Sequence, residues 1–179
     1  GIGKATSATL ASRGAKVIAG GRSMDRLHAL ATELGPNCLA LDLDVTDASS
    51  TETMLNRLPA EWREIHGLVV CAGHDIGGRA AFHSASADDW ASTIDTNVTG
   101  TIRVCRAVID GMLERGAGHI VTLGSVSGYK TYEGGSAYTA SKFAIRAFTD
   151  SLCLDYRDTD LRVTEILPGM VRTEFALRR

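Results

Sequence analysis

Short apolar runs alternate along the chain with longer stretches in which apolar residues recur every three or four positions. The short runs predict buried strands at residues 16–19, 38–43, 68–71, 119–123 and 162–167. The longer stretches predict helices at residues 5–14, 24–34, 47–58, 90–115 and 136–156. Gly35 and Pro36 end the second of these helices, and Pro59 follows the third.

The regular alternation of strand and helix predicts an α/β fold, in which a parallel sheet lies between two layers of helices. The strands are short and apolar, as expected of strands that are buried on both faces. No internal repeat, low-complexity segment or linker interrupts the pattern. We therefore expect residues 1–179 to form one domain, or part of one.

The composition is that of an ordinary globular protein and excludes several function classes. Of the 179 residues, 44% are hydrophobic, and 19 basic residues nearly balance 21 acidic ones for a net charge of −2. This balance leaves no basic patch for nucleic acid or anionic lipid, and no apolar run reaches the ~20 residues of a membrane span. The four cysteines, at positions 38, 71, 105 and 153, lie too far apart to indicate a metal site or a disulfide framework. We therefore predict a cytoplasmic protein that binds neither metal, nucleic acid nor membrane.

Both ends of the sequence fall inside the predicted pattern. Gly1 opens directly on a helix without a preceding strand, and Arg179 follows shortly after a Pro-Gly turn. No charged and apolar leader precedes the first helix. We expect an internal fragment that is truncated at both ends; a processed mature chain is the alternative.

In a parallel sheet of this type, ligands bind at the carboxyl ends of the strands. Gly1-Ile2-Gly3 leads into the first helix, where glycines allow a pyrophosphate to approach the backbone and the helix N-terminus. Arg22 and Ser23 follow the strand at 16–19 with no carboxylate beside them, and a guanidinium there suits the 2′-phosphate of a dinucleotide. A tight turn and a solvated loop arginine are the alternative interpretations.

Two further strand ends carry candidate binding residues. Asp44-Val45 follows the strand at 38–43, and its carboxylate could accept a hydrogen bond from an adenine amino group. Capping of the next helix is the alternative role for this aspartate. Ala72-Gly73 follows the strand at 68–71, where the backbone must pass close to a ligand.

The strongest chemical pattern is a serine at a strand end, followed by a tyrosine and a lysine on one helix. Tyr138 and Lys142 are four residues apart and share a helical face. An ammonium near a phenol favours the phenolate and lowers the pKa of the tyrosine, so that it can give or take a proton near neutral pH. Ser125 closes the strand at 119–123 and lies at the same edge, where its hydroxyl could hold a substrate oxygen.

Taken in order, these motifs resemble the short-chain dehydrogenase/reductase family over nearly the whole chain. The matching motifs are Gly1-Ile2-Gly3, Asp44-Val45, Ala72-Gly73, Asn97, Ser125, Tyr138-x-x-x-Lys142 and Pro168-Gly169. The resemblance implies a three-layer αβα Rossmann fold, a nicotinamide cofactor and a catalytic tetrad. Tyr138 would be the general acid/base, Lys142 would lower its pKa and bind the nicotinamide ribose, and Ser125 would orient the carbonyl or alcohol. Asn97 would bend its helix and hold a water of the proton relay.

The resemblance also implies how the cofactor is bound. The implied positions are Gly1, Ile2, Arg22, Ser23, Asp44, Val45, Cys71, Ala72, Gly73, Tyr138, Lys142, Pro168, Gly169, Val171 and Thr173. Thr173 would hold the carboxamide or the phosphates, and Arg22 favours NADP over NAD. The family further implies a homodimer or homotetramer formed through the helices at 90–115 and 136–156. The second of these helices carries apolar residues on more than one side, as such an interface requires; burial of these residues in the core of the subunit is the alternative.

The chain departs from the family in three places. Cys71 stands where the family has asparagine, which we interpret as a structural substitution at a buried strand end; a redox role is the alternative. The family's first strand, which lies in the middle of its sheet, and the first glycine of its fingerprint are absent. Everything after Arg179 is absent as well. We therefore expect a gap in the sheet.

Several segments resemble more closely the branch of NADP-dependent 3-hydroxy acid (serine/allo-threonine) dehydrogenases. They are residues 17–22, 58–62, 94–97 and 173–175. This branch acts on small hydroxy acids and their carbonyl forms, and in it an arginine six residues after Thr173 faces the substrate acid. The matching residue is Arg179, with Arg178 as the close alternative and Arg79 as a weaker one.

Some alternatives remain open. His74-Asp75, in a loop that departs from the branch, is either a polar turn or a metal or proton-relay pair. The enzyme is a hydroxy acid dehydrogenase or a broader carbonyl or 3-oxoacyl reductase. A non-catalytic nucleotide-binding member, and an epimerase or dehydratase of the extended family, are further candidates. The intact tetrad argues against a non-catalytic member, and the short loops argue against an epimerase or dehydratase.

Overall fold

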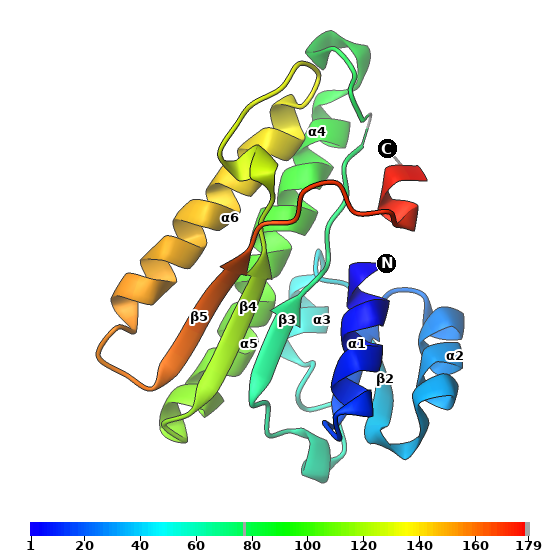
Figure 1. Cartoon of the computed structure of the whole chain (residues 1–179), viewed down its shortest axis with the longest axis vertical. Helices are drawn as coiled ribbons and strands as arrows, with labels where there is room; N and C mark the ends of the chain where they lie inside the picture. Colours follow the sequence, from blue (N-terminus) through cyan, green and yellow to red (C-terminus); the bar gives the residue numbers. More distant parts are fainter. Residues whose placement is uncertain (77, 178–179) are drawn as a thin grey trace.

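The computed structural model describes residues 1–76 and 78–177, and in it strands and helices alternate in the predicted order (Figure 1). The strands are β1 (Val17–Gly21), β2 (Cys38–Asp42), β3 (Gly67–Val70), β4 (Gly118–Leu123) and β5 (Leu161–Ile166). The α-helices are α1 (Ile2–Ser12), α2 (Met24–Leu34), α3 (Ala48–Glu52), α4 (Ala87–Ile94), α5 (Gly100–Glu114) and α6 (Ser136–Asp155). Each strand lies within two residues of its predicted bounds.

All strand pairs are parallel, as predicted, but they form two sheets. β1 pairs with β2 over its whole length, and β3, β4 and β5 form a second sheet in that order. The register of the second sheet places Leu123, at the end of β4, beside Ile166, at the end of β5. The break falls between β1 and β3, where the family resemblance places a central strand, so the expected gap is found.

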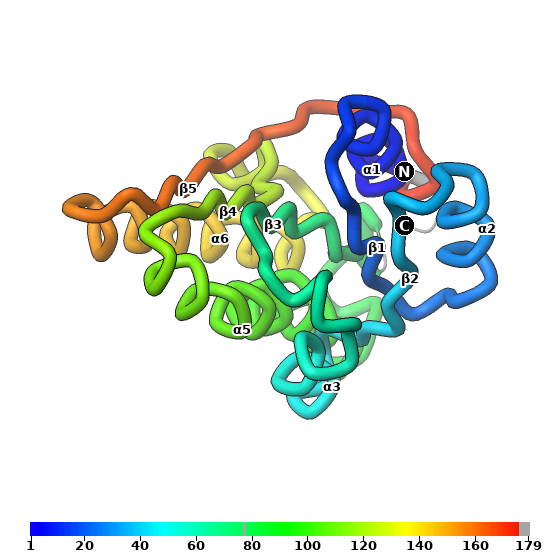
Figure 2. Tube along the Cα trace, turned by 90° about the horizontal axis from the view of Figure 1, so that it is seen from below, coloured from blue at the N-terminus to red at the C-terminus, as the bar shows by residue number. Residues whose placement is uncertain are grey.

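Helices cover the strands on both sides (Figure 2). α5 and α6 lie together on one side of the second sheet, and α1 lies on the opposite side, next to β1. α2 packs against β1 and β2. This layering confirms the predicted α/β Rossmann fold.

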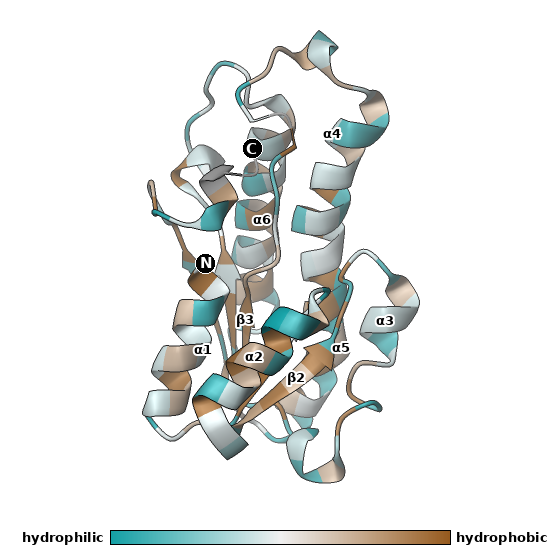
Figure 3. Ribbon diagram, turned by 90° about the vertical axis from the view of Figure 1, so that its right-hand side faces the viewer, coloured by the Kyte–Doolittle hydropathy of each residue, from teal (hydrophilic) through white to brown (hydrophobic). Residues whose placement is uncertain are grey.

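Apolar side chains between α5 and the strands form the main core. Burial of this surface is the chief contribution to folding stability. The cluster consists of Leu41, Met54, Leu58, Val70, Val104, Cys105, Val108, Ile109, Met112, Ile120, Leu152 and Leu161. A second cluster joins α2 to β1 and β2 and consists of Val17, Ala19, Leu30 and Cys38. Figure 3 shows the same pattern, with a largely hydrophobic β2 and hydrophilic bands along α2 in front of it.

Two helices differ from those that the apolar spacing predicts. The helix expected at 47–58 is only α3, because its serines and threonines favour the helix weakly, and Met54 and Leu58 reach the core from the turns that follow. The helix expected at 90–115 consists of α4, a π-helical turn at Asp95–Thr99, and α5. Within residues 1–76 and 78–177, no helix is long and apolar enough to cross a membrane.

The parallel strands place their carboxyl ends at one edge of the molecule, where binding sites of such sheets lie. The first and last described segments meet at this edge. A Cβ added to Gly1 would lie 3.7 Å from the Cβ of Thr173, and Figure 1 shows the N-terminus next to the C-terminal turn. Segments that are far apart in the sequence therefore come together around the predicted site.

Candidate active site

Lys142 is firmly fixed on the buried face of α6. It is only 7% exposed, and its Nζ donates a 2.7 Å hydrogen bond to the backbone carbonyl of Leu123 at the end of β4. Burial lowers the pKa of the Lys142 ammonium to about 8, although the Glu165 carboxylate acts in the opposite direction. A buried ionisable group with a shifted pKa at this edge of the sheet indicates a functional site.

Tyr138 lies one turn before Lys142 on α6, as their spacing predicts. The Lys142 Nζ is 5.6 Å from the centre of the Tyr138 ring. The ring of Phe175, from the C-terminal segment, lies 5.9 Å from the Tyr138 ring between centres and is tilted by 51°. The Tyr138 ring therefore has a buried ammonium and an aromatic ring as neighbours.

Ser125 follows β4 and is 7% exposed. Its Oγ accepts a 3.1 Å hydrogen bond from the backbone N–H of Ser127, at the start of a short 3₁₀ turn. Gly128 ends this turn directly against α6, since a Cβ at this position would lie 2.9 Å from the Lys142 carbonyl oxygen. The close approach keeps Ser125 at the same end of β4 as Tyr138 and Lys142.

Asn97 is 1% exposed and lies in the π-helical turn between α4 and α5. Its Oδ1 accepts a 2.8 Å hydrogen bond from the His74 N–H, and its Nδ2 donates to the His74 carbonyl at 2.9 Å and to the Ser141 Oγ at 3.0 Å. Ser141 in turn donates to the Tyr138 carbonyl at 2.7 Å. Asn97 therefore connects the end of β3 to the turn of α6 that carries Tyr138.

Arg22 and Ser23 directly follow β1, at the position predicted for a phosphate site. Arg22 is exposed, and the Ser23 Oγ accepts a 3.0 Å hydrogen bond from the Arg26 Nε. Arg26 also forms an ion pair with Glu174 at 3.4 Å, which links α2 to the C-terminal segment. A second guanidinium, which the sequence analysis did not single out, therefore lies at this strand end.

Asp44 orders the loop between β2 and α3. Its Oδ1 accepts hydrogen bonds from the Thr46 backbone N–H at 2.9 Å and from the Thr46 hydroxyl at 2.7 Å. These bonds lower the pKa of the Asp44 carboxyl. The side chain of Asp47 caps α3 by accepting from the Ser49 N–H at 2.9 Å, so the capping alternative for Asp44 is wrong. Val45 is half-buried beside it.

Cys71, Ala72 and Gly73 follow β3. A Cβ added to Gly3 would lie 3.3 Å from the Cys71 Cβ, so this strand end packs against the start of α1. Burial raises the pKa of the Cys71 thiol, which disfavours the thiolate that redox chemistry needs. The geometry therefore favours the structural role of Cys71. Ala72 and Gly73 are exposed and leave their backbone open to a ligand.

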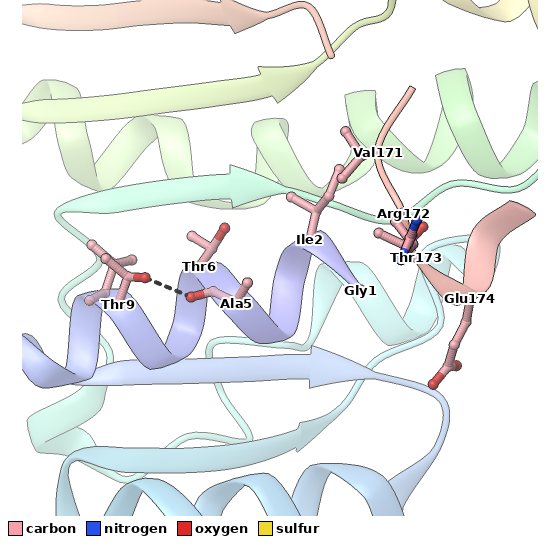
Figure 4. A pocket seen from close by; sticks show the side chains of 10 residues that line it. Gly1, Ile2, Ala5, Thr6, Thr9, Val171, Arg172, Thr173 and Glu174 are labelled. Carbon is pink, nitrogen blue, oxygen red and sulfur yellow. Dashed lines mark hydrogen bonds between the residues drawn. The ribbon is translucent and has the colours of Figure 1, made fainter. Parts of the chain in front are cut away.

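A cavity of about 660 Å³ lies between α1 and the segment after β5 (Figure 4). Gly1 and Ile2 line it from one side, and Val171 and Thr173 line it from the other. Its remaining lining residues are Ala5, Thr6, Thr9, Leu10, Arg172 and Glu174. No side chain caps α1 at Gly1, which leaves the helix N-terminus to an anion such as a phosphate. Four predicted cofactor positions therefore share this cavity, and none of the four tetrad residues lines it.

The segment after β5 connects this cavity with the tetrad. The Pro168 carbonyl accepts a 3.3 Å hydrogen bond from the Val126 N–H, in the turn that follows Ser125. Gly169, next along the chain, is exposed. The predicted cofactor positions after β5 therefore begin beside the turn that carries Ser125 and end at the cavity.

The structure does not place the arginines predicted to hold the substrate beside the four predicted catalytic residues. Arg179 and its alternative Arg178 lie outside those residues. Arg79 is exposed, and its guanidinium lies 5.4 Å from the centre of the Tyr132 ring.

The loop that begins at His74 is attached to Asn97 through the backbone N–H and carbonyl of His74. Asp75 is 4% exposed, and the His74 Nε2 is buried without a hydrogen-bond partner in the described part of the chain. Among residues 1–76 and 78–177, no three His, Cys, Asp or Glu side chains lie close enough together to hold a metal ion.

Two polar residues of the site were missed by the sequence analysis. Ser141 bridges Asn97 and Tyr138, and the available signal was a small polar residue directly before the lysine of the motif. Glu165 lies on β5, where burial raises the pKa of its carboxyl. Its signal was a single acid in a strand end, residues 163–167, that is otherwise uncharged.

The chain is similar in sequence to known short-chain dehydrogenases. The model of the short chain dehydrogenase family matches residues 1–178. An NADP-dependent 3-hydroxy acid dehydrogenase of Salmonella typhi is 45% identical over 177 residues, which span 98% of this chain and 71% of that protein. A serine 3-dehydrogenase of Agrobacterium fabrum is 37% identical over 179 residues, which span 100% of this chain and 71% of that protein.

A solved structure shows the same similarity in three dimensions. The closed form of a serine dehydrogenase complexed with NADP+ superimposes with a TM-score of 0.92 at 44% sequence identity. The match covers 96% of this chain and 69% of that one. The family predicted from the motifs is therefore confirmed, and the chain belongs to the short-chain dehydrogenase family.

Proposed function

We propose that this chain belongs to an NADP-dependent oxidoreductase that transfers hydride between the nicotinamide and a small hydroxy acid or its carbonyl form. One observation carries the proposal: the buried Lys142 ammonium lies 5.6 Å from the Tyr138 ring at the carboxyl edge of the sheet. Burying a charge costs stability, and a protein that only binds nucleotide has no use for this arrangement. The pair therefore supports catalysis over the non-catalytic alternative.

The proposed reaction moves a hydride and a proton separately. The nicotinamide, when bound, supplies or takes the hydride. Tyr138 gives a proton to the carbonyl oxygen during reduction and takes one from the hydroxyl during oxidation. Lys142 favours the phenolate, and Ser125 donates a hydrogen bond that keeps the substrate oxygen beside Tyr138. Asn97 fixes the helix turn that carries Tyr138 and holds a water of the proton relay.

NADP is the proposed cofactor, with NAD as the alternative. Arg22 and Arg26 offer guanidinium groups at the end of β1, where a 2′-phosphate would lie, and the cavity beside Gly1 suits the pyrophosphate. The Salmonella typhi relative is named as NADP-dependent, and the serine dehydrogenase neighbour is complexed with NADP+. These similarities support the same cofactor in this chain.

Replacing Tyr138 by phenylalanine removes the proton carrier but keeps the ring. We expect kcat of the full-length enzyme, with NADPH and a carbonyl substrate, to fall by about 10² or more, while NADPH still binds. Steady-state kinetics and a fluorescence titration of NADPH measure the two effects. Tyr156→Phe, at the far end of α6, is the matched control and should keep wild-type turnover. Near-normal turnover in Tyr138→Phe would reject the mechanism.

Replacing Arg22 by alanine tests the cofactor. We expect KM for NADPH to rise by about tenfold or more and KM for NADH to change little, because only NADPH carries the 2′-phosphate. Arg13→Ala, an exposed arginine after α1, should change neither value. A wild-type preference for NADH, or equal effects of Arg22→Ala on both cofactors, would contradict the assignment.

We further propose that the substrate carries a carboxylate or sulfonate, held by Arg179. The support is similarity, because the relatives described above are named for a 3-hydroxy acid and for serine, both small molecules with an acid group. A guanidinium can grip such a group through two parallel hydrogen bonds and so fix the reacting carbon. A broader carbonyl reductase, in which Arg178 and Arg179 are simply solvated, is the alternative.

A matched pair of substrates separates these alternatives. The full-length enzyme should prefer a small 3-hydroxy acid over its uncharged amide, as measured by kcat/KM. Arg179→Met should remove this preference and change kcat/KM for the amide little, because only the acid meets the guanidinium. If the wild-type enzyme already prefers the amide, the hydroxy acid assignment fails.

We also propose that copies of the chain associate through α5 and α6. Ile102 on α5 and Phe143 and Leu154 on α6 are 42%, 40% and 63% exposed, which is a high exposure for large apolar side chains. Ile145, by contrast, is 1% exposed and belongs to the core. Light scattering of the full-length protein should give a dimer or tetramer, and a monomer would refute the proposal.

A further inference from the structure

The carboxyl group of Glu165 lies over the end of β4. Its Oε1 is buried and has no hydrogen-bond partner among the described residues. The space that it fills exists because residue 124 is a glycine, since a Cβ at Gly124 would collide with this oxygen. A buried carboxyl oxygen without a hydrogen bond is costly, which calls for a compensating interaction.

The end of β4 is where the proposed chemistry takes place. Gly124 lies between Leu123, whose carbonyl binds the Lys142 Nζ, and Ser125. Its N–H donates a 2.9 Å hydrogen bond to the Ile166 carbonyl, so β4 and β5 are still paired at this point. Glu165, one residue before Ile166, is therefore held beside the carbonyl that anchors the lysine.

Three charged residues of α6 act on the Glu165 carboxyl. Burial is the largest influence and raises the pKa of the Glu165 carboxyl, as does Asp150, whereas Arg146 and Lys142 favour the charged form. Arg146 is already engaged, because its Nε lies 3.8 Å from the Asp150 Oδ2 and its guanidinium lies 3.7 Å from the centre of the Tyr129 ring. On β4, the residues next to Glu165 are Thr122, its partner in the strand register, and Gly124, both uncharged.

We propose that Glu165 is a positioning residue that keeps Lys142 in its ammonium form beside Tyr138. This role rests on the oxidoreductase function proposed above. Lys142 is nearly excluded from water and donates to a neutral carbonyl, so a nearby negative charge is needed to offset the cost of its burial. Glu165 supplies that charge from β5 without touching the substrate.

The consequence for the reaction follows from the sign of the charges. Without the Glu165 carboxylate, Lys142 loses its proton at lower pH and is neutral over more of the pH range in which the enzyme acts. A neutral lysine no longer favours the Tyr138 phenolate, which alcohol oxidation requires as its base. Oxidation should then need a higher pH.

The test compares Glu165→Gln with Glu114→Gln in the full-length protein. Glu114 ends α5 and is exposed, so the control makes the same change away from the site. Lysine labelled with ¹³C at Cε reports the titration of Lys142 by NMR, with its signal assigned from Lys142→Arg. We expect the Lys142 midpoint to fall by about one pH unit in Glu165→Gln and to stay unchanged in Glu114→Gln. An unchanged midpoint in Glu165→Gln would overturn the proposal.

The pH profile of alcohol oxidation is the second readout. Its acidic limb should move upward by about one pH unit in Glu165→Gln, and Glu165→Asp, which keeps the charge, should return the limb most of the way to its wild-type position. Should the glutamine variant not fold, Glu165→Thr, which suits a strand, takes its place. An inactive wild-type enzyme would refute the proposed function, whereas an active enzyme without any shift would refute only the role of Glu165.

Discussion

The hydrogen bond from the Lys142 Nζ to the Leu123 carbonyl, at 2.7 Å, fixes the relation between α6 and the end of β4. Because Lys142 lies on α6, the bond also sets the position of Tyr138 one turn earlier. Because Leu123 ends β4, it sets both relative to Ser125, two residues further on. The proposed proton chemistry depends on this alignment, since a catalytic group must be held within hydrogen-bond reach of the atom that it serves.

The alignment has a cost, because the buried face of α6 is unusually polar. It carries Ser141, Lys142 and Thr149, whose hydroxyl lies 2.8 Å from that of Thr122 on β4. The hydrogen bonds of Ser141, Lys142 and Thr149 favour one rotation and depth of the helix, because a buried polar group without a partner is costly. The pKa of Lys142, about 8, lies below its ordinary value of 10.5, so the folded state holds this proton less tightly than the unfolded chain. This group therefore lowers stability progressively as the pH falls from about 10.5 to about 8.

The positions of the strands along the chain could be predicted from the sequence because buried parallel strands are short apolar runs that stand out between helices. Ser125, Tyr138 and Lys142 could be proposed as site residues because one follows a strand end and the other two share a helix face, whereas Asn97 entered only through the family resemblance. The apolar spacing did not predict the π-helical turn around Asn97, since one extra residue in a turn leaves the spacing on either side intact; only the family resemblance implied a bend there. Glu165 was missed for another reason: its surroundings are set by Gly124 and by a helix far away in sequence, and no local pattern records them.

The action of the Lys142 ammonium on the Tyr138 phenol is open to direct measurement. Tyrosine labelled with ¹³C at Cζ reports the titration of each phenol by NMR in the full-length protein. Tyr138 should lose its proton at a lower pH in the wild type than in Lys142→Met, because methionine fills a similar volume without the charge. Tyr156, at the other end of α6, should titrate alike in both proteins. Equal titration midpoints for Tyr138 in the two proteins would contradict the proposed pairing of ammonium and phenol.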